Sequence, residues 1–296
     1  MDSSHPQSIT SSNPKREAEK SIMVSRKHAK FMATYCQQDF SMPDSVIFYI
    51  AKNPKTAVLY LKMVKTCKYF FVKNPINIID CLYTRYGKWG VNEKPLDLTK
   101  YNCKYWITDH IWACADEFVD KNILSPIIPK LYRCDVKHVS LSDQIISYHD
   151  FSFIISSVEE IYLNRVIVKH ADGSDVPIED IIAIAVNAQD VYVYKPTITP
   201  KTMKELLQIP HFATLDRLTL CDLSEMFDIN AFYSYMKKNH HTKFFLNFNE
   251  QISEGYMNRL ETIVDEILET KQFNYKPPGI NFTGLDIQKY RLLFSM

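Results

Sequence analysis

The feature that most limits the fold of this chain is a set of short apolar runs that recurs through its second half. Five runs share an apolar-x-apolar core: Val139-x-Leu141, Ile161-x-Leu163, Tyr192-x-Tyr194, Leu218-x-Leu220 and Phe244-x-Leu246. Their second anchors lie 22, 31, 26 and 26 residues apart, close to the roughly 20 to 29 residues of a leucine-rich repeat. This recurrence predicts a row of similar units, each built on one short strand.

Helical patterns fill the intervals between these runs, at 177–187, 199–209, 228–239 and 253–271. Thr199 before Pro200, and Asp228 before an apolar-periodic stretch, are typical helix starts. Strands and helices that alternate at a near-constant period predict parallel strands joined by right-handed crossovers. We therefore expect an α/β fold in which residues 136–296 form a curved, leucine-rich-repeat-like solenoid. A short doubly wound α/β domain is the alternative.

A compact helical unit is expected at residues 39–75. Ser41 or Met42 can cap a helix with Pro43 in its first turn, and Thr56 can cap the next helix. A unit of fewer than about 40 residues buries too little apolar surface to be stable alone, so it needs a partner. A mobile tail with a frayed helix at 17–35 is expected at residues 1–38, and the helical unit follows at 39–75. A connecting subdomain is expected at 76–135, and the repeat-like domain at 136–296.

Composition excludes several classes of function. The 35 Lys and Arg nearly balance the 34 Asp and Glu, which predicts neither a nucleic-acid nor a membrane partner. The six glycines never follow the G-x-G-x-x-G spacing of a phosphate-binding loop. Seven cysteines without a C-x-x-C pair indicate reduced thiols in a cytoplasmic or nuclear protein. No stretch reaches the roughly 18 apolar residues of a membrane span, so neither anchor nor signal peptide is expected.

The helical unit resembles an F-box. The run from Met42 to Ile50, followed by Leu59, Leu61, Val64 and the segment 67–70 (Cys-Lys-Tyr-Phe), is similar to a pattern that begins Leu-Pro and ends Cys-Lys-aromatic. Met42 stands where Leu is usual, and Tyr69-Phe70 where a basic residue and Trp are common. The whole chain resembles the nematode F-box C family, which has segments similar to residues 105–108, 129–134, 209–212 and 275–278.

The resemblance implies a non-catalytic substrate receptor that docks on the Skp adaptor, and through it on a cullin, in a ubiquitin ligase. It implies no cofactor. By analogy, the residues that bury against the adaptor are Met42, Pro43, Val46, Ile47, Ile50, Leu59, Met63 and Val64. Alternatively, the same residues cap the end of the solenoid. A repeat scaffold without ubiquitin machinery, and an enzyme with a dispersed site, remain the competing functions.

A surface for an unknown protein substrate is expected on the sheet. Side chains that alternate with the buried anchors face away from the core, namely His138, Ser140, Glu160, Tyr162, Val191, Val193, Arg217, Thr219, Lys243 and Phe245. Tyr162, Arg217 and Phe245 are the candidate substrate-binding residues, because aromatic and arginine side chains dominate protein interfaces. His240-His241 lacks a third ligand at metal-binding spacing, so no metal site is expected.

Overall fold

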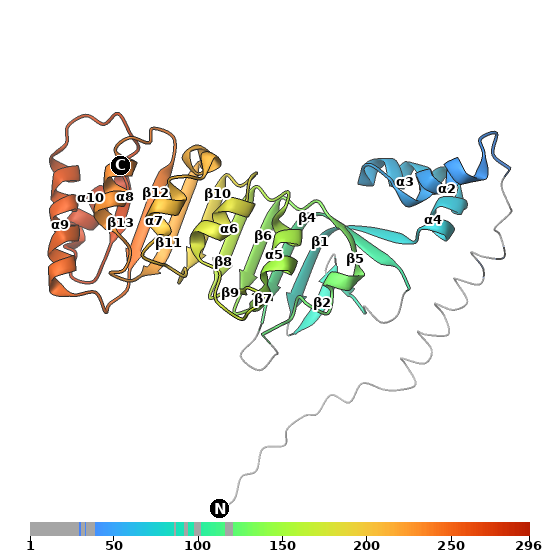
Figure 1. Cartoon of the computed structure of the whole chain (residues 1–296), viewed down its shortest axis with the longest axis horizontal. Coiled ribbons are helices and arrows are strands. Elements are labelled where there is room, and N and C mark those ends of the chain that lie inside the picture. Colours follow the sequence, from blue (N-terminus) through green and yellow to red (C-terminus); the bar gives the residue numbers. More distant parts are fainter. Residues whose placement is uncertain are drawn as a thin grey trace, which may run out of the picture. The chain divides into compact units, whose positions relative to one another are not determined.

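The chain forms two compact units, residues 1–75 and 76–296 (Figure 1). The computed structural model describes residues 39–85, 87–91, 94–97, 102–115 and 121–296, together with Lys30 and Ala33, which are helical. The expected mobile tail and its helix therefore lie outside the described residues, apart from these two. No helix among the described residues is both long enough and apolar enough to cross a bilayer.

The first unit contains three short helices: α2 (Asp44–Lys52), α3 (Ala57–Thr66) and α4 (Lys68–Lys73). Thr56 caps α3 as predicted, since its hydroxyl accepts a hydrogen bond from the Leu59 amide at 3.1 Å. The predicted cap of α2 is wrong. Pro43 itself holds the N-cap position, and its carbonyl accepts from the amides of Val46 and Ile47, so Pro43 precedes the helix instead of lying in its first turn.

Hydrogen bonds to Asn74 join the three helices of this unit. The Tyr60 hydroxyl on α3 donates to the Asn74 carbonyl at 2.5 Å. The Asn74 side-chain amide donates to the carbonyls of Ala51 and Lys52, at the end of α2, at 3.0 and 3.4 Å. Asn74 and Tyr60 are buried. These bonds hold the last turn of α2 and the middle of α3 against the residue that follows α4.

The second unit is built on one mostly parallel sheet. Its order is β13-β12-β11-β10-β8-β6-β4-β1-β2-β3, with β5 beside β4. The strands are β1 (Ile76–Arg85), β2 (Lys88–Val91), β3 (Lys94–Pro95), β4 (Lys104–Cys114), β5 (Leu131–Cys134), β6 (His138–Ser142), β8 (Glu160–Asn164), β10 (Asp190–Tyr194), β11 (Arg217–Leu223), β12 (Lys243–Phe248) and β13 (Gly279–Asn281). Two further short strands, β7 (Ile145–Ser147) and β9 (Ile167–Lys169), pair apart from this sheet.

The segment 76–135 belongs to the same sheet as the repeats. Strand β4 is parallel to β6 from the His110–His138 pair to the Cys114–Ser142 pair, and it is also parallel to β1 on its other side. The structure therefore does not separate 76–135 from 136–296 as distinct subdomains. Among the described strands of the main sheet, the β1–β2 and β2–β3 pairs are the antiparallel ones.

A repeated backbone pattern links the strands that the sequence predicted. The carbonyl of Lys137 accepts from the amides of Glu159 and Glu160, and the carbonyl of Glu159 accepts from those of Gln189 and Asp190. Each bond pair ties the start of one strand to the start of the next. Strands β6, β8, β10, β11 and β12 are thereby held in register, in the order in which they occur in the chain.

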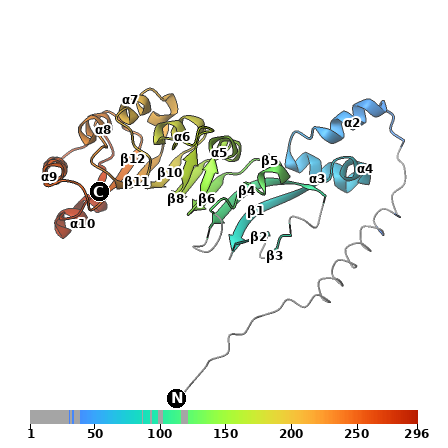
Figure 2. The same ribbon diagram turned by 60° about the horizontal axis from the view of Figure 1, so that its bottom comes forward.

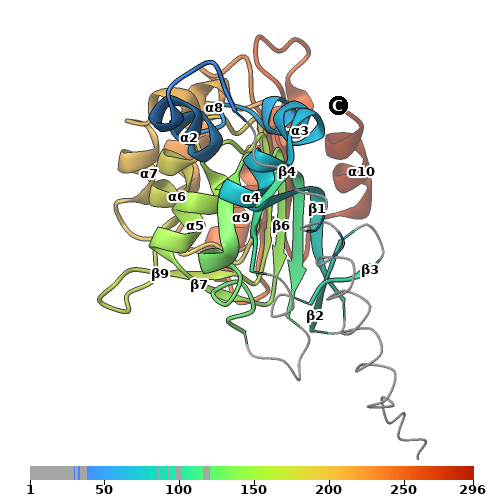
Figure 3. The ribbon, with the colours of Figure 1, turned by 90° about the vertical axis from the view of Figure 1, so that its right-hand side faces the viewer.

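Helices cover one face of this sheet. They are α5 (Tyr148–Ile155), α6 (Ile178–Ile184), α7 (Thr202–Leu206) and α8 (Ile229–Met236), and Figure 3 shows them on the side opposite to α10 (Ile287–Ser295). The long helix α9 (Glu254–Glu269) buries Leu260, Ile263, Val264 and Ile267. Figure 2 shows helices α5 to α8 along one side of the sheet. Buried side chains of the helices and strands together form the core.

The predicted anchors of β10 are wrong by one residue. Val191 and Val193 are buried and pair in register with Ile161 and Leu163 of β8, whereas Tyr192 pairs with Tyr162 on the other face. Val191 and Val193 therefore do not lie on the open face of the sheet. Residues 191–194 alternate valine with tyrosine, and both are typical strand residues, so alternation alone does not decide which pair of side chains turns inward.

Candidate functional site

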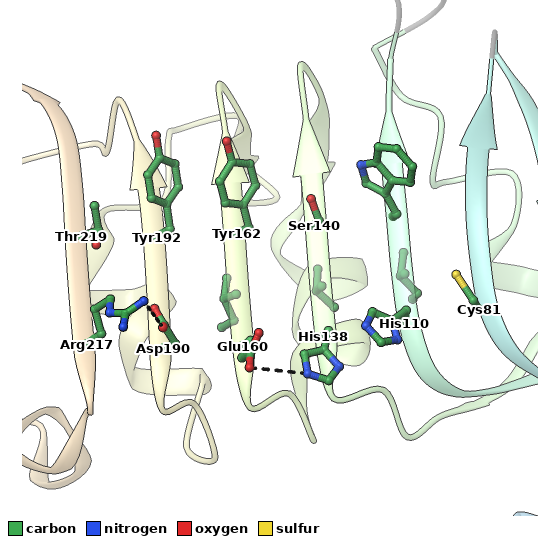
Figure 4. A pocket seen from close by; sticks show the side chains of 14 residues that line it. Cys81, His110, His138, Ser140, Glu160, Tyr162, Asp190, Tyr192, Arg217 and Thr219 are labelled. Carbon is green, nitrogen blue, oxygen red and sulfur yellow. Dashed lines mark ion pairs between the residues drawn. The ribbon is translucent and has the colours of Figure 1, made fainter.

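The open face of the sheet carries two rows of side chains that cross neighbouring strands. The register places His110, His138, Glu160, Asp190 and Arg217 in a polar row. Two positions further along the same strands, it places Trp112, Ser140, Tyr162, Tyr192 and Thr219 in a second row. Together they line a hollow of about 570 Å³, shown in Figure 4.

Ion pairs occupy most of the polar row. Arg217 Nη1 lies 3.2 Å from Asp190 Oδ2, and His138 Nε2 lies 3.5 Å from Glu160 Oε1 (Figure 4). Burial raises the pKa of Asp190, and the charges of Glu160 and Asp216 add to this, while Arg217 opposes it. Arg217 is thus engaged with a carboxylate of its own chain, which reduces its capacity to bind an acidic partner.

A cluster of Asp109, His110 and His138 lies at one end of the polar row. Between the Ile79–Ile107 and Cys81–His110 pairs, β4 contains one residue more than β1. In this irregular part of β4, Asp109 Oδ2 lies 3.0 Å from His110 Nδ1 and Asp109 Oδ1 lies 3.6 Å from His138 Nδ1. Irregular strand registers of this kind frequently re-aim side chains next to functional sites.

This cluster is the candidate metal site among the described residues. One ligand atom from each of its three members lies within 4.8 Å of the other two, and two imidazoles with a carboxylate suit zinc. However, the rings of His110 and His138 stack at 4.2 Å with planes 14° apart. The nitrogen lone pairs therefore lie in two separate, nearly parallel planes and cannot both point at one ion, so coordination requires at least one ring to turn.

The second row consists largely of aromatic rings. Tyr162 and Tyr192 stack face to face, with centroids 4.4 Å apart and planes at 10°. Trp112 is 56% exposed and Tyr162 is 40% exposed. Ser140 lies between these two residues on the intervening strand. The row therefore presents two exposed rings on either side of a small side chain.

The thiols at this face are poor nucleophiles. Burial raises the pKa of the Cys81 thiol, and the nearby charges of Asp109 and Asp80 raise it further. Burial likewise raises the pKa of the Cys221 thiol. A thiol is reactive as its thiolate, so a raised pKa lowers the reactive fraction at neutral pH. The other functional groups that the hollow offers are carboxylates, imidazoles, a guanidinium, hydroxyls and aromatic rings.

The three candidate substrate-binding residues all lie on this face, but they are not equivalent. Tyr162 and Arg217 line the hollow. Phe245, on β12, packs against Phe294 of α10 with ring centroids 5.8 Å apart. Part of its surface is therefore already covered, and Phe245 lies outside the set of residues that line the hollow.

Sequence reasoning missed Trp112 and His110. Both lie in the segment 76–135, where no strand had been assigned. The signal was present, since His110 and Trp112 alternate with the buried Ile111 and Ala113. This alternation is the same pattern that identified the later strands.

The residues predicted to bind an adaptor differ in their exposure to solvent. Met42, Pro43, Val46 and Leu59 are exposed, whereas Ile50, Met63 and Val64 are half-buried. Ile47 is only 3% exposed. It packs in the interior of the helical unit, and its role as an adaptor contact stays a prediction.

Other apolar side chains on the same unit are open to solvent. Tyr49 is 67% exposed, and Phe48, Val58 and Leu61 are also exposed. With Met42, Val46 and Leu59 they form the exposed apolar set of residues 42–61. Comparison with known proteins adds no assignment, since no protein-family model matches the chain and no curated protein matches it significantly.

Proposed function

We propose that this chain is the substrate-recognition subunit of a Skp-cullin-F-box ubiquitin ligase. Its helical unit would bind the Skp adaptor, and the open face of its sheet would bind a target protein. In this proposal the parallel strands and their helices form a leucine-rich-repeat-like solenoid that follows an F-box. A non-catalytic repeat scaffold without ubiquitin machinery is the alternative.

The exposed apolar set of residues 42–61 is the observation that carries this proposal. Soluble proteins expose apolar side chains singly, whereas a contiguous group indicates an interaction surface. Here seven large apolar side chains are exposed within 20 residues, in the segment that resembles an F-box. Burial of such side chains contributes about 1.5–3 kcal/mol each when it is complete. A few of them suffice to drive association with an apolar groove.

The proposed role requires no catalytic group from this chain. A receptor raises the effective concentration of a target lysine near a charged ubiquitin carrier. The open sheet face would bind the target protein, and the helical unit would attach the receptor to the ligase. The receptor would act in the cytoplasm or the nucleus.

Co-purification with a purified Skp adaptor tests the proposal. We expect the intact chain to bind the adaptor and the variant Val46→Asp, Leu59→Asp to lose binding, because both side chains are exposed apolar members of the set. Val186→Asp is the matched control, since Val186 is equally apolar and exposed but lies in the sheet unit. Ile47→Asp is unsuitable, because a charge at this buried position unfolds the unit.

Two results would contradict the receptor role. One is a folded intact chain that fails to bind the adaptor at micromolar concentrations of both proteins. The other is unchanged binding by the Val46→Asp, Leu59→Asp variant. Either result favours the scaffold alternative, in which the apolar set serves a partner outside the ubiquitin system.

A further inference from the structure

Trp112 and Tyr162 lie on either side of Ser140 on the open face of the sheet, and the space between their rings is called the gap. They lie on β4 and β8, which both pair with β6, and Ser140 of β6 is in register with both residues. Adjacent strands are about 4.8 Å apart, so the backbones that carry the two rings are about 9.6 Å apart. A flat group stacks on a ring at about 3.5–4.0 Å. The strand spacing therefore leaves room above Ser140 for one planar group that stacks on either ring.

The neighbouring ring pair shows why the gap lies at this position. Tyr162 and Tyr192 are on adjacent strands, and their rings contact each other directly at 4.4 Å. This stack leaves no room for a ligand, but it supports Tyr162 from behind and limits its movement. On the other side of Tyr162, the small side chain of Ser140 leaves the space open.

The charge beside the gap favours a cation. Glu160 lies two residues before Tyr162 on the same strand and the same face. Its side chain is 63% exposed, and in the described part of the chain its ion-pair partner is His138, at 3.5 Å. Asp190, the next carboxylate in the row, already has Arg217 at 3.2 Å. Glu160 is thus the carboxylate of this row that has no lysine or arginine partner within the described residues.

We propose that the gap between Trp112 and Tyr162 binds an arginine side chain of the captured protein, with Glu160 accepting hydrogen bonds from its guanidinium. This inference rests on the proposed function, in which the sheet face captures a protein. A guanidinium is planar, stacks on aromatic faces and donates in a fork that matches a carboxylate. A lysine ammonium is a compact point charge and fills a slot between two rings less well.

Peptide selection with the intact chain tests this assignment without the adaptor. A randomised peptide library is panned against the protein, and the retained sequences are synthesised with arginine, lysine or citrulline at the enriched position. Citrulline keeps the planar shape but lacks the charge. We expect retained peptides to contain arginine, and either replacement to weaken binding about tenfold. Trp112 fluorescence reports binding, because Trp89 and Trp106 are buried.

Variants of the protein locate the site. Trp112→Ala and Glu160→Gln should each weaken arginine-peptide binding about tenfold. Glu159→Gln is the matched control, since it removes the same charge one residue away, where Glu159 pairs with Lys137 instead. Both test side chains are more than half exposed, so the fold should persist, and the urea midpoint of each variant verifies this.

Three outcomes would overturn the inference: retained peptides without arginine, equal binding of the lysine and arginine forms, or unchanged affinity in folded Trp112→Ala and Glu160→Gln variants. Because the adaptor is absent from this assay, its result is independent of the receptor role. A chain that binds the adaptor but no arginine peptide refutes only the arginine site. A chain that binds the peptide but no adaptor refutes only the ligase assignment.

Discussion

Replacing Asn74 with alanine should selectively destabilise the helical unit. The Asn74 amide donates to the carbonyls of Ala51 and Lys52 at 3.0 and 3.4 Å, and Ala51 is fully buried. Alanine leaves these carbonyls without that donor, at a cost of about 1–3 kcal/mol for a buried polar group. A central value of about 2 kcal/mol corresponds to a roughly thirtyfold rise in the population of the opened unit.

Hydrogen exchange detected by mass spectrometry resolves this effect along the chain. Peptides from residues 44–73 should lose about thirtyfold in protection, while peptides from β6 to β12 should be unchanged, because these strands belong to the other compact unit. Asn53→Ala is the control, since the Asn53 amide bonds the Tyr49 carbonyl at 2.8 Å in an exposed setting. Equal loss of protection in both variants, or no loss in Asn74→Ala, would refute the reasoning.

Two further predictions concern the sheet unit, and urea unfolding followed by tryptophan fluorescence measures both. Arg165 donates a hydrogen bond to Asp143 and lowers the pKa of this carboxyl in the folded protein. The pair therefore stabilises the fold at pH values above the unfolded pKa of about 3.9. This stability is lost as the pH falls through the lower pKa that Asp143 has in the folded protein. Asp143→Asn should therefore be less stable than the native chain at neutral pH and equal to it in strong acid; a constant difference across this range would contradict the assignment. Asn accepts the left-handed φ of 57° at this position, so the variant isolates the charge. Gly279→Ala should cost about 1–3 kcal/mol through overpacking, because its added methyl would lie 2.7 Å from Phe245 Cδ1 and 3.1 Å from Phe294 Cε1. Gly255→Ala meets nothing within 4 Å, so an equal loss in both variants would argue against the close contact.

The sequence predicted the strands where polar and aliphatic residues alternate cleanly. Leu218 and Leu220 of β11 are flanked by Arg217 and Thr219, so the inward pair is unambiguous. β4 was missed because its extra residue near Asp109 interrupts the alternation. Helix α5 was also missed, since its β-branched and aromatic residues, such as Phe151 and Ile154, are equally typical of a strand.

The candidate site could be predicted only in part, because it depends on which strands are neighbours. Tyr162 and Arg217 follow from alternation within single strands. Predicting the gap between Trp112 and Tyr162 requires knowing that β6 lies between β4 and β8. No local sequence pattern contains this order of strands. For Ile47, the sequence shows an apolar residue in a short helix, but whether it faces the core is decided by how α2 packs within the three-helix unit.

The two edges of the main sheet bear on how the chain avoids aggregation. Within the described residues, the sheet ends in β3, which has two residues including Pro95, and in β13, which has three. Short edge strands and proline offer little backbone to an intruding strand. α10 packs against β13, and Lys289 of α10 ties it to Glu261 and Asp265 of α9.

A chain truncated after Lys271 would lose both β13 and α10. It would then expose β12 as the edge, whose sequence Lys-Phe-Phe-Leu-Asn-Phe is strongly β-forming and carries a single charge. Such a product is expected to self-associate through this strand. The last 25 residues thus protect β12 from strand addition, and proteolysis between α9 and β13 would leave an aggregation-prone edge.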